Sequence, residues 1–506
     1  MRIMLIVPTF HYTEGYPTYL SLSDFPVGVA YLSASLKQAG HEVIGVNPNN
    51  ITGYPSAHIM LQTVLSDKIR QTKPMVIGLG GLATDYAFLR DAIQIIRAVA
   101  PDTPIVLGGQ IVTNDAEDIC DLLQPDYAIV GEADKALVDL ISTEGRAVTT
   151  PTIITAEVIT DLDSLPFPDY SPFGIDDMLD NHSMDTRILY RYSQPYPRPF
   201  VIVASRSCPF NCSFCIHGHR DMPYRARSIA NIMAEITETW ARYHYNVLMI
   251  DDELFAVTNK RLREFSEAVL EGRKEHGWEF DWMFQTHASA KLDLETLQLA
   301  KSAGCYLFSY GLESASPTIL KSMNKRITVP QIIEAIEMAH KAKLAFGGNL
   351  IFGDIAETVD TCAESLAFWF EHCREDFIFL TNLRPYPGSK LFDEIRSMGA
   401  YPDKKVYYEN IDKGVPNLTK ISMPDFDNLT KLLVSLETSW IFVGRANNVR
   451  KEIEYVNGNN TMYKMWGTCP YCGEESMYRQ EFPSRLDTFA LGTGCLHCGR
   501  KMKVET

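Results

Sequence analysis

Short hydrophobic runs alternate with longer amphipathic stretches over the first 145 residues of the chain. Apolar runs bounded by glycine or proline predict buried strands, and stretches whose apolar positions recur every three or four residues predict helices. The expected strands are residues 3–7, 40–44, 75–80, 105–107 and 127–130, and the expected helices are residues 27–39, 85–100 and 115–123. Strands that alternate with helices indicate an α/β fold with a doubly wound parallel sheet.

Small or polar residues follow several of these strands, at the pairs Pro8-Thr9, Gly80-Gly81, Gly108-Gly109 and Gly131-Glu132. Doubly wound sheets bind ligands at the carboxyl ends of their strands. Glycine at that edge lets a ligand approach the backbone closely. Gly108, Gly109, Gly131 and Glu132 are therefore candidates for cofactor binding, although glycine pairs also serve simply to make tight turns.

Alternation of strands and helices resumes between residues 200 and 400. The expected strands are residues 200–204, 247–250, 281–285, 306–310, 346–351 and 377–380, and the expected helices lie near residues 229–244, 259–275, 293–303, 330–343 and 358–372. Six such units predict a partial (β/α)6 barrel of the TIM type, whose chemistry lies at the carboxyl ends of the strands.

A chain of 506 residues is too long for one ordinary core and should divide into about three domains. The pattern predicts a first domain over residues 1–145 and the barrel over residues 200–400. Between them, residues 146–199 form a proline-rich connector, for which extended chain is expected. Residues 401–506 form a C-terminal region with a small metal module at about 462–503.

Composition narrows the class of protein. No run of about 18 apolar residues is present, and the first hydrophobic run is too short for a signal peptide, so a cytoplasmic location is expected. The net charge of −16 argues against broad non-specific binding to nucleic acid. Eleven cysteines in a cytoplasmic chain indicate metal sites and free thiols. Of the scattered cysteines, Cys120, Cys305 and Cys362 are expected to be core thiols, and Cys373 is expected to be exposed.

Cys208, Cys212 and Cys215 have the spacing Cys-x3-Cys-x2-Cys and follow the first expected barrel strand directly. Three thiolates can hold three irons of a four-iron cluster and leave the fourth iron free to bind a small molecule. The alternative is a set of buried or zinc-binding thiols. It is disfavoured because zinc knuckles pair cysteines as Cys-x2-Cys and use four ligands.

Two Cys-x2-Cys knuckles lie near the C-terminus: Cys469 with Cys472, and Cys495 with Cys498. Four thiolates suit tetrahedral Zn(II) or a rubredoxin-like iron. Such a site has no open position, so a structural role is favoured, although a rubredoxin-like iron could relay electrons. Nucleic-acid contact by a zinc ribbon is disfavoured by the acidity of the chain.

The cysteine spacing, with the aromatic Phe214 before the last cysteine, resembles the signature of radical S-adenosylmethionine (SAM) enzymes. Residues 26–43, 73–78, 105–109 and 130–132 resemble phrases of the cobalamin-binding domain that precedes many radical SAM domains. The resemblance implies a corrinoid-binding domain over roughly residues 1–145. The histidine motif that ligates cobalt in cobalamin mutases is absent, and the usual Gly-Glu-Gly-Glu appears as Gly131-Glu-Ala-Asp134.

The resemblance also implies how SAM is held. Asp251, Asp252 and Glu253, after the second barrel strand, match the position that holds the methionyl amino group, although an acidic helix cap explains them equally well. Arg225 and Arg227 lie in a phrase after the cysteine loop and would pair with the SAM carboxylate. Surface cations are the alternative for both arginines.

Three further strand ends carry family phrases. Glu313 and Ser314 are candidates for the ribose hydroxyls and the methionyl group. Gly353 and Glu357 lie in a glycine-rich run suited to the flat adenine. His287 stands where relatives often have arginine and is a candidate for substrate handling, although a lone histidine is more often structural.

The resemblance implies reductive cleavage of SAM at the 4Fe-4S cluster to a 5′-deoxyadenosyl radical, with an electron donor such as flavodoxin or ferredoxin. Cobalamin-dependent methylation of an unactivated carbon of a small molecule, lipid or peptide is the favoured outcome. A radical SAM oxidoreductase, cyclase or carbon–carbon coupling enzyme that keeps the first domain without methyl transfer is the alternative. A methylthiotransferase is disfavoured because its extra cysteine cluster is missing, and a non-catalytic iron-sulfur or corrinoid carrier ranks last.

Overall fold

The computed structural model describes residues 1–9, 12, 18, 25–143, 150–180, 194, 197–217, 222–411, 413–439, 442–484 and 489–505. The chain divides into two compact units. The first unit comprises Met1–Thr186, Phe214–Arg227 and Pro385–Gly414, and the second comprises Arg187–Ser213, Ser228–Arg384 and Val415–Thr506.

The first unit contains a six-stranded sheet in the order β2-β1-β3-β4-β5-β6. Its strands are β1 (Arg2–Ile6), β2 (Glu42–Val46), β3 (Val76–Gly80), β4 (Ile105–Gly108), β5 (Tyr127–Val130) and β6 (Thr152–Thr155). Every neighbouring pair is parallel. Because the order reverses between β1 and β3, the sheet is doubly wound, as predicted. The last strand, β6, lies within the stretch that the sequence pattern assigned to the connector.

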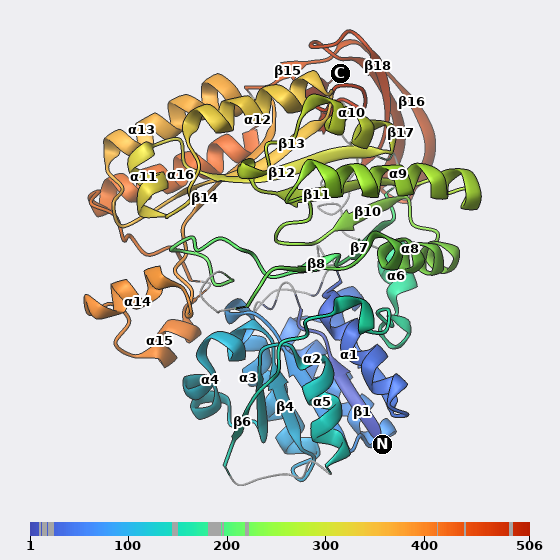
Figure 1. Cartoon of the computed structure of the whole chain (residues 1–506), viewed down its shortest axis with the longest axis vertical. Helices are drawn as coiled ribbons and strands as arrows, with labels where there is room; N and C mark the ends of the chain where they lie inside the picture. Colours follow the sequence, from blue (N-terminus) through green and yellow to red (C-terminus); the bar gives the residue numbers. More distant parts are fainter. Residues whose placement is uncertain are drawn as a thin grey trace. The chain divides into compact units, whose positions relative to one another are not determined.

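Five helices connect these strands: α1 (Val27–Gln38), α2 (Ala57–Thr72), α3 (Tyr86–Val99), α4 (Gln110–Leu123) and α5 (Ala133–Ser142) (Figure 1). Three were expected, and α2 and α5 were not. The connector contains the helix α6 (Ile175–Asp180). The prediction that the connector is extended chain is therefore wrong for these residues. The short strand β9 (Arg225–Ala226) also belongs to this unit.

Residues beyond the barrel return to the first unit as α14 (Lys390–Ser397) and α15 (Lys404–Glu409). The ammonium of Lys404 contacts Asp115 at 2.5 Å and also contacts Asp118, while the Tyr408 hydroxyl donates to Asp115 at 2.9 Å. These contacts fasten α15 to α4, which is kinked at Asp115.

The second unit contains a parallel sheet in the order β14-β13-β12-β11-β10-β7. The strands are β7 (Pro199–Ile202), β10 (Val247–Ile250), β11 (Asp281–Thr286), β12 (Cys305–Glu313), β13 (Ala345–Phe352) and β14 (Phe377–Asn382), with β8 (Ser205–Arg206) after β7. The helices are α8 (Ile229–Tyr243), α9 (Asn259–His276), α10 (Leu294–Ser302), α11 (Pro317–Ser322), α12 (Val329–Lys341) and α13 (Val359–Phe368). Each strand pairs with the next one along the chain, which confirms the predicted partial barrel.

The C-terminal region of this unit begins with helix α16 (Met423–Ser439). Two three-stranded sheets follow, with strands β15 (Gly444–Arg445), β16 (Asn447–Asn457), β17 (Asn460–Thr468), β18 (Glu475–Pro483), β19 (Ala490–Gly494) and β20 (Lys501–Glu505). The core of this module is formed by its own apolar residues, including Met465, Tyr478 and Met502, together with three of the knuckle cysteines.

The scattered cysteines all lie in the interior. Cys120, Cys305 and Cys362 are buried as expected. The expectation that Cys373 is exposed is wrong, because this thiol ends a π-helical turn (Trp369–Cys373) whose inner face packs into the barrel, and it is 0% exposed. Of the charged residues that follow it, Arg374 is exposed and Glu375 is half-buried, whereas Asp376 is buried.

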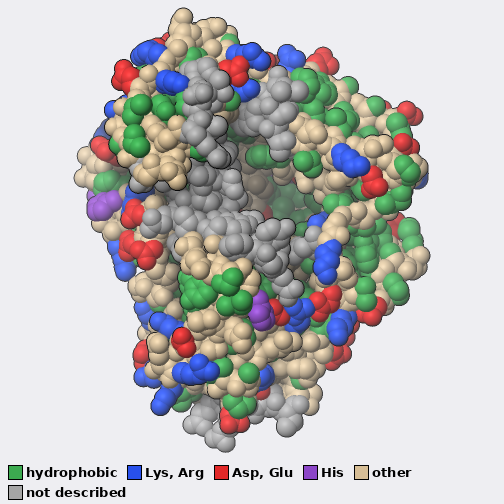
Figure 2. All heavy atoms as spheres, turned by 180° about the vertical axis from the view of Figure 1, so that it is seen from behind, with side chains coloured by type: hydrophobic (Ala, Val, Ile, Leu, Met, Phe, Trp, Pro, Cys, Tyr) green, Lys and Arg blue, Asp and Glu red, His purple; other side chains and the backbone are tan. Residues whose placement is uncertain are grey.

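On the face shown in Figure 2, acidic and basic side chains of the described residues are interspersed rather than gathered into one basic area. Among the described helices, none is both long enough and apolar enough to cross a bilayer.

Candidate active site

The three-cysteine loop leaves the carboxyl end of β7, where barrel chemistry is expected. Cys212 is buried, and Cys208 and Cys215 are half-buried. Within the second unit, the Ser213 N–H donates to the Met323 carbonyl at 2.9 Å, and the Asn324 amide donates to the Asn211 carbonyl at 2.7 Å. The turn that follows α11 therefore holds the middle of the cysteine loop.

The donor set of this loop suits an iron-sulfur cluster. Three thiols lie within eight consecutive residues, and the His217 N–H points to the Cys215 sulfur at 3.5 Å. Backbone donors of this kind stabilise a ligating thiolate and tune the bound metal. Three protein ligands leave one iron of a four-iron cluster open.

Asp252 supports the start of this loop. One carboxylate oxygen accepts the Ala204 N–H at 2.7 Å, and the other accepts the Ser205 hydroxyl at 2.6 Å. Burial raises the pKa of Asp252 to about 6, while the hydrogen bond from Ser205 acts in the opposite direction. Asp252 therefore ties the end of β10 to the exit of β7. Asp251 is exposed and Glu253 half-buried, and their contact with SAM stays a prediction.

Glu313 forms a buried ion pair that the sequence analysis did not identify. Its Oε1 lies 2.8 Å from the Lys325 ammonium, and both side chains are 8% exposed. Glu313 has φ = +65°, so the strand bends sharply where its carboxylate is presented. The adjacent Ser314 hydroxyl contacts the Ser365 hydroxyl at 3.0 Å. The pair places a carboxylate and an ammonium at the carboxyl end of β12.

Glu357 and Asp354 follow β13. Glu357 accepts the backbone N–H groups of Gly353 and Asp354. Burial raises the pKa of Glu357 to about 7, against the effect of those two donors. Asp354 accepts the Ser322 hydroxyl at 2.6 Å through Oδ1, whereas its buried Oδ2 has no hydrogen-bond partner among the described residues. An unsatisfied buried acceptor suits a ligand that brings a donor, such as the amino or hydroxyl groups of SAM.

Ser322 connects Asp354 to the cysteine loop. Its hydroxyl donates to Asp354, and its carbonyl accepts the Ser213 hydroxyl at 3.2 Å. The end of β13 and the cysteine loop are thus joined through one residue. Asp354 was not among the predicted site residues, because an aspartate in a loop gives no sequence signal until its partner is known.

His287 lies against the cysteine loop through its ring. The rings of His287 and Phe210 stack with centroids 3.9 Å apart. Burial, followed by the charge of Lys325, lowers the pKa of His287 to about 4. The imidazole is therefore neutral near pH 7, and its Nδ1 accepts the Ser289 N–H at 3.2 Å. These contacts show that His287 packs against the cysteine loop, and its role in substrate handling stays a prediction.

Arg225 and Arg227 have partners within the first unit. Arg225 forms a two-point pair with the Glu132 carboxylate, at 2.9 and 2.8 Å, and both side chains are largely buried. Arg227 donates to the Tyr31 hydroxyl at 3.2 Å and lies over the Phe167 ring. The proposed contact of these arginines with the SAM carboxylate stays a prediction, as does direct cofactor binding by Glu132.

The carboxyl edge of the first sheet carries glycine turns and a buried polar atom. Gly109 has φ = +82°, and a Cβ there would lie 2.6 Å from the Gly81 backbone nitrogen. The two glycine turns therefore pack directly on each other, and both conformation and space exclude a side chain at Gly109. At the end of β1, the buried Thr9 hydroxyl has no hydrogen-bond partner among the described residues. Gly108 is the last residue of β4 and Gly131 directly follows β5, so both lie at this edge as predicted.

The two C-terminal knuckles come together. The sulfurs of Cys469, Cys472, Cys495 and Cys498 all lie within 4.8 Å of one another, which suits one tetrahedral metal ion. The Tyr471 N–H points to Cys469 at 3.5 Å, and the His497 N–H points to Cys495 at 3.4 Å. The predicted four-cysteine group is confirmed.

Two family descriptions match the chain. Residues 24–141 match the B12 binding domain, and residues 202–368 match the radical SAM superfamily. The chain contains a B12-binding domain and a radical SAM domain. The family resemblance inferred from the sequence is confirmed, and a 4Fe-4S cluster, SAM and cobalamin are the groups that these domains imply.

Several known proteins are similar to most of the chain. A protein of Pyrococcus horikoshii named as an uncharacterized methyltransferase is 24% identical over 412 residues, covering 78% of this chain and 83% of its own length. The anaerobic magnesium-protoporphyrin IX monomethyl ester cyclase of Cereibacter sphaeroides is 25% identical over 409 residues, covering 78% of this chain and 64% of its own. The structure of the radical SAM methyltransferase TsrM from Kitasatospora setae, with cobalamin and a [4Fe-4S] cluster bound, has the same fold, with a TM-score of 0.57, 16% identity and coverage of 79% and 75% of the two chains.

The raised pKa of Glu357 predicts a pH-dependent effect of Glu357→Gln. Below about pH 4.5 the carboxyl is protonated in both the folded and unfolded states, so it contributes nothing. As the pH rises toward 7, the unfolded state loses its proton first and the folded state is destabilised, by roughly 3 kcal/mol at full effect. Glu357→Gln removes this cost and keeps a carbonyl acceptor. The variant should therefore gain stability over wild type between about pH 5 and pH 8, measured by urea unfolding.

Glu337→Gln, at an exposed glutamate, is the control. If the difference in unfolding free energy between variant and wild type were the same at about pH 4.5 and at about pH 7, the raised pKa of Glu357 would be contradicted.

Proposed function

We propose that this chain is a cobalamin-dependent radical SAM methyltransferase that methylates an unactivated carbon of a small molecule or lipid. The observation that carries this conclusion is the three-cysteine loop at the end of β7, in a radical SAM domain preceded by a B12-binding domain. Similarity to methyltransferases over most of the chain supports the reaction class.

Different residues would hold the iron-sulfur cluster and the cobalamin. Cys208, Cys212 and Cys215 would bind the cluster, and the glycine edge around Gly108 and Gly109 would border cobalamin. When bound, the cluster would supply the electron for SAM cleavage and cobalamin would supply the methyl group.

The residues at the strand ends of the barrel would bind and orient SAM. Glu313 offers a carboxylate that suits ribose hydroxyls. Asp354 offers an unpaired buried oxygen, and Glu357 shapes the turn by holding two backbone N–H groups. Asp252 fixes the entry into the cysteine loop.

A second candidate is a radical SAM cyclase or oxidoreductase that uses the same first domain without methyl transfer. The similarity to an anaerobic cyclase over 78% of this chain supports it. Both candidates require SAM cleavage, and they differ in whether S-adenosylhomocysteine accumulates.

The test is anaerobic reconstitution of the full chain with iron, sulfide, hydroxocobalamin, SAM and dithionite. We expect one bound corrinoid per chain and formation of both 5′-deoxyadenosine and S-adenosylhomocysteine, measured by mass spectrometry. With methyl-deuterated SAM, the label should appear on the bound corrinoid. Deoxyadenosine without S-adenosylhomocysteine would favour the cyclase. Absence of both products, with the cluster present, would contradict any radical SAM activity.

The physiological setting follows from the chemistry. A flavodoxin or ferredoxin is the proposed electron donor. A cytoplasmic location is proposed because none of the eleven cysteines, all of them among the described residues, forms a disulfide, as is usual in reducing compartments.

A further inference from the structure

The second knuckle of the four-cysteine module lies against the amino-terminal ends of two barrel strands. A Cβ on Gly499 would lie 2.2 Å from the backbone nitrogen of Ala345, the first residue of β13. The Lys501 N–H donates to the Glu375 carbonyl at 2.7 Å, and the Lys501 ammonium lies 5.5 Å from the ring centroid of Phe377, the first residue of β14. Gly499 has φ = +77°, so a side chain is excluded both by conformation and by space.

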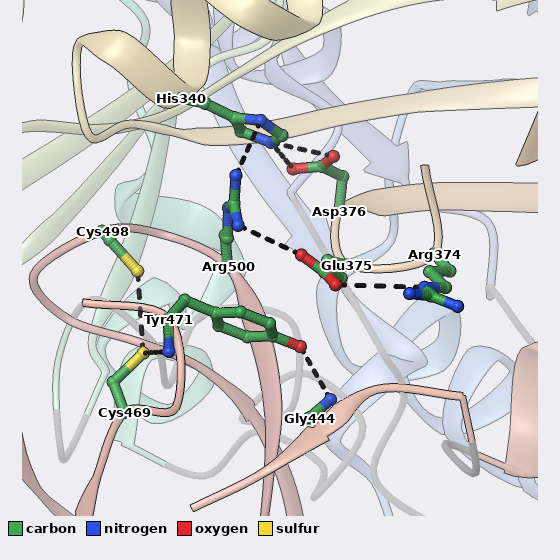
Figure 3. Close-up of polar contacts among 9 residues, drawn as sticks. All are labelled: His340, Arg374, Glu375, Asp376, Gly444, Cys469, Tyr471, Cys498 and Arg500. Atoms are coloured by element: carbon green, nitrogen blue, oxygen red, sulfur yellow. Dashed lines mark hydrogen bonds and ion pairs between the residues drawn. The ribbon is translucent and has the colours of Figure 1, made fainter. Parts of the chain in front are cut away.

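Arg500 joins the knuckle to the barrel through side chains (Figure 3). Its guanidinium donates to Glu375 at 3.2 Å and to His340 Nδ1 at 3.2 Å. Because arginine can only donate, Nδ1 is the acceptor, and Nε2 of His340 carries the proton that it donates to the buried Asp376 at 2.9 Å. Arg500 also lies over the ring of Tyr471, in the first knuckle. One side chain thus contacts α12, the turn before β14 and the other knuckle.

The surface beneath the module is apolar. Five residues at or near the starts of the barrel strands form one buried cluster: Val247, Tyr306, Leu307, Ala345 and Phe377. A barrel interior is a packed core, and an uncovered end would expose these side chains to water. The close approach of Gly499 to Ala345 and of Lys501 to Phe377 covers part of that end.

The module lies at the end opposite to the SAM site. Along β13 the chain runs from Ala345, beside Gly499, to Phe352, just before Gly353 of the proposed SAM site. The seven residue steps from Ala345 to Phe352 span roughly 23 Å of extended chain. Because the strands are parallel, their starts form one edge and their ends the other. The four-cysteine metal is therefore separated from the carboxyl end of the strand by its whole length.

We propose that the metal-loaded four-cysteine module is the closure of the amino-terminal end of the barrel, attached there by Arg500 and Gly499, and that its metal does not pass electrons to the SAM site. Metal binding folds the knuckles. The folded knuckles in turn protect the first residues of β13 and β14. This structural role of the module does not depend on which reaction the barrel catalyses.

The first test is hydrogen–deuterium exchange of the full chain carrying Arg500→Ala. We expect the variant to keep its four-cysteine metal, measured by elemental analysis. Exchange should rise on the order of tenfold at residues 345–348 and 377–379, because a half-buried charge-assisted contact is lost. Residues 350–353 should be unchanged. Arg450→Ala is the matched control, since Arg450 belongs to the same module but pairs with the exposed Glu475. Unchanged exchange at the strand starts would overturn the closure.

The second test separates the structural role from a redox role. Chains loaded at the four-cysteine site with Zn(II) or with iron, each with an intact 4Fe-4S cluster, are compared. We expect equal thermal stability and equal reduction of the cluster by dithionite, followed by electron paramagnetic resonance. Loss of cluster reduction in the zinc form alone would overturn the proposal and make the metal an electron relay. Cys472→Ser, which removes one ligand, should raise exchange at the same strand starts as Arg500→Ala.

Discussion

A chain with alanine at Cys208, Cys212 and Cys215 should fold but lose SAM cleavage by a factor on the order of a thousand or more, because no other described group supplies the cluster. The iron-sulfur absorbance of the reconstituted protein should disappear with the activity. The measurements are 5′-deoxyadenosine by mass spectrometry and absorbance near 400 nm, as a rough marker of a four-iron cluster. Folding is checked by far-ultraviolet circular dichroism.

Cys120→Ala is the matched control for this substitution. Cys120 is also a buried free thiol, on α4 of the first unit, but it belongs to neither ligand group. Its loss should leave the cluster and SAM cleavage intact, while lowering stability slightly through a small cavity. Retention of full turnover in the triple alanine chain would refute the assignment of the cluster. Equal loss of turnover in the control would show that the assay reports stability rather than ligation.

The strand–helix pattern predicted both sheets because buried parallel strands leave continuous apolar runs. All six barrel strands were located to within a few residues, from β7 to β14. Helix α2 was not predicted, although Ser56 caps its first turn by accepting the Ile59 N–H. The six strands of the C-terminal region were not predicted either. Antiparallel strands with one solvated face normally alternate apolar and polar residues. In β16 the pairing with β17 shifts register twice and most side chains are exposed, so the alternation is too weak to identify the strand.

The candidate site was predictable where ligands are close in sequence and unpredictable where partners are distant. Two cysteine groups could be identified by spacing alone. The pairing of Arg225 with Glu132 joins residues 93 positions apart, and only the fold shows it. Asp252 and Ser314 illustrate a second limit, because polar residues at strand ends also serve the backbone beside them. In the structure both already have partners, Ser205 and Ser365.

The pair between Glu313 and Lys325 should dominate the energetics of the SAM end. Lys325→Ala leaves a buried carboxylate without its partner, at a cost of about 3–5 kcal/mol in the free energy of unfolding of the barrel. The measurement is urea unfolding followed by the fluorescence of tryptophans such as the buried Trp282. Lys341→Ala is the control. It breaks a pair with Glu337 in which both side chains are more than half exposed, and should cost less than about 1 kcal/mol.

The double variant Glu313→Gln with Lys325→Met distinguishes stability from function. Replacing both charges by uncharged groups of similar size should restore most of the stability lost in Lys325→Ala, because no buried charge remains unpaired. If Glu313 binds the ribose of SAM, this stable double variant should still bind SAM at least about tenfold more weakly than wild type, since charge-assisted hydrogen bonds are lost. Equilibrium dialysis with the reconstituted chain measures that affinity. Wild-type affinity in the double variant would assign the pair to the barrel core alone, and failure to recover stability would show that the ion pair itself is net stabilising.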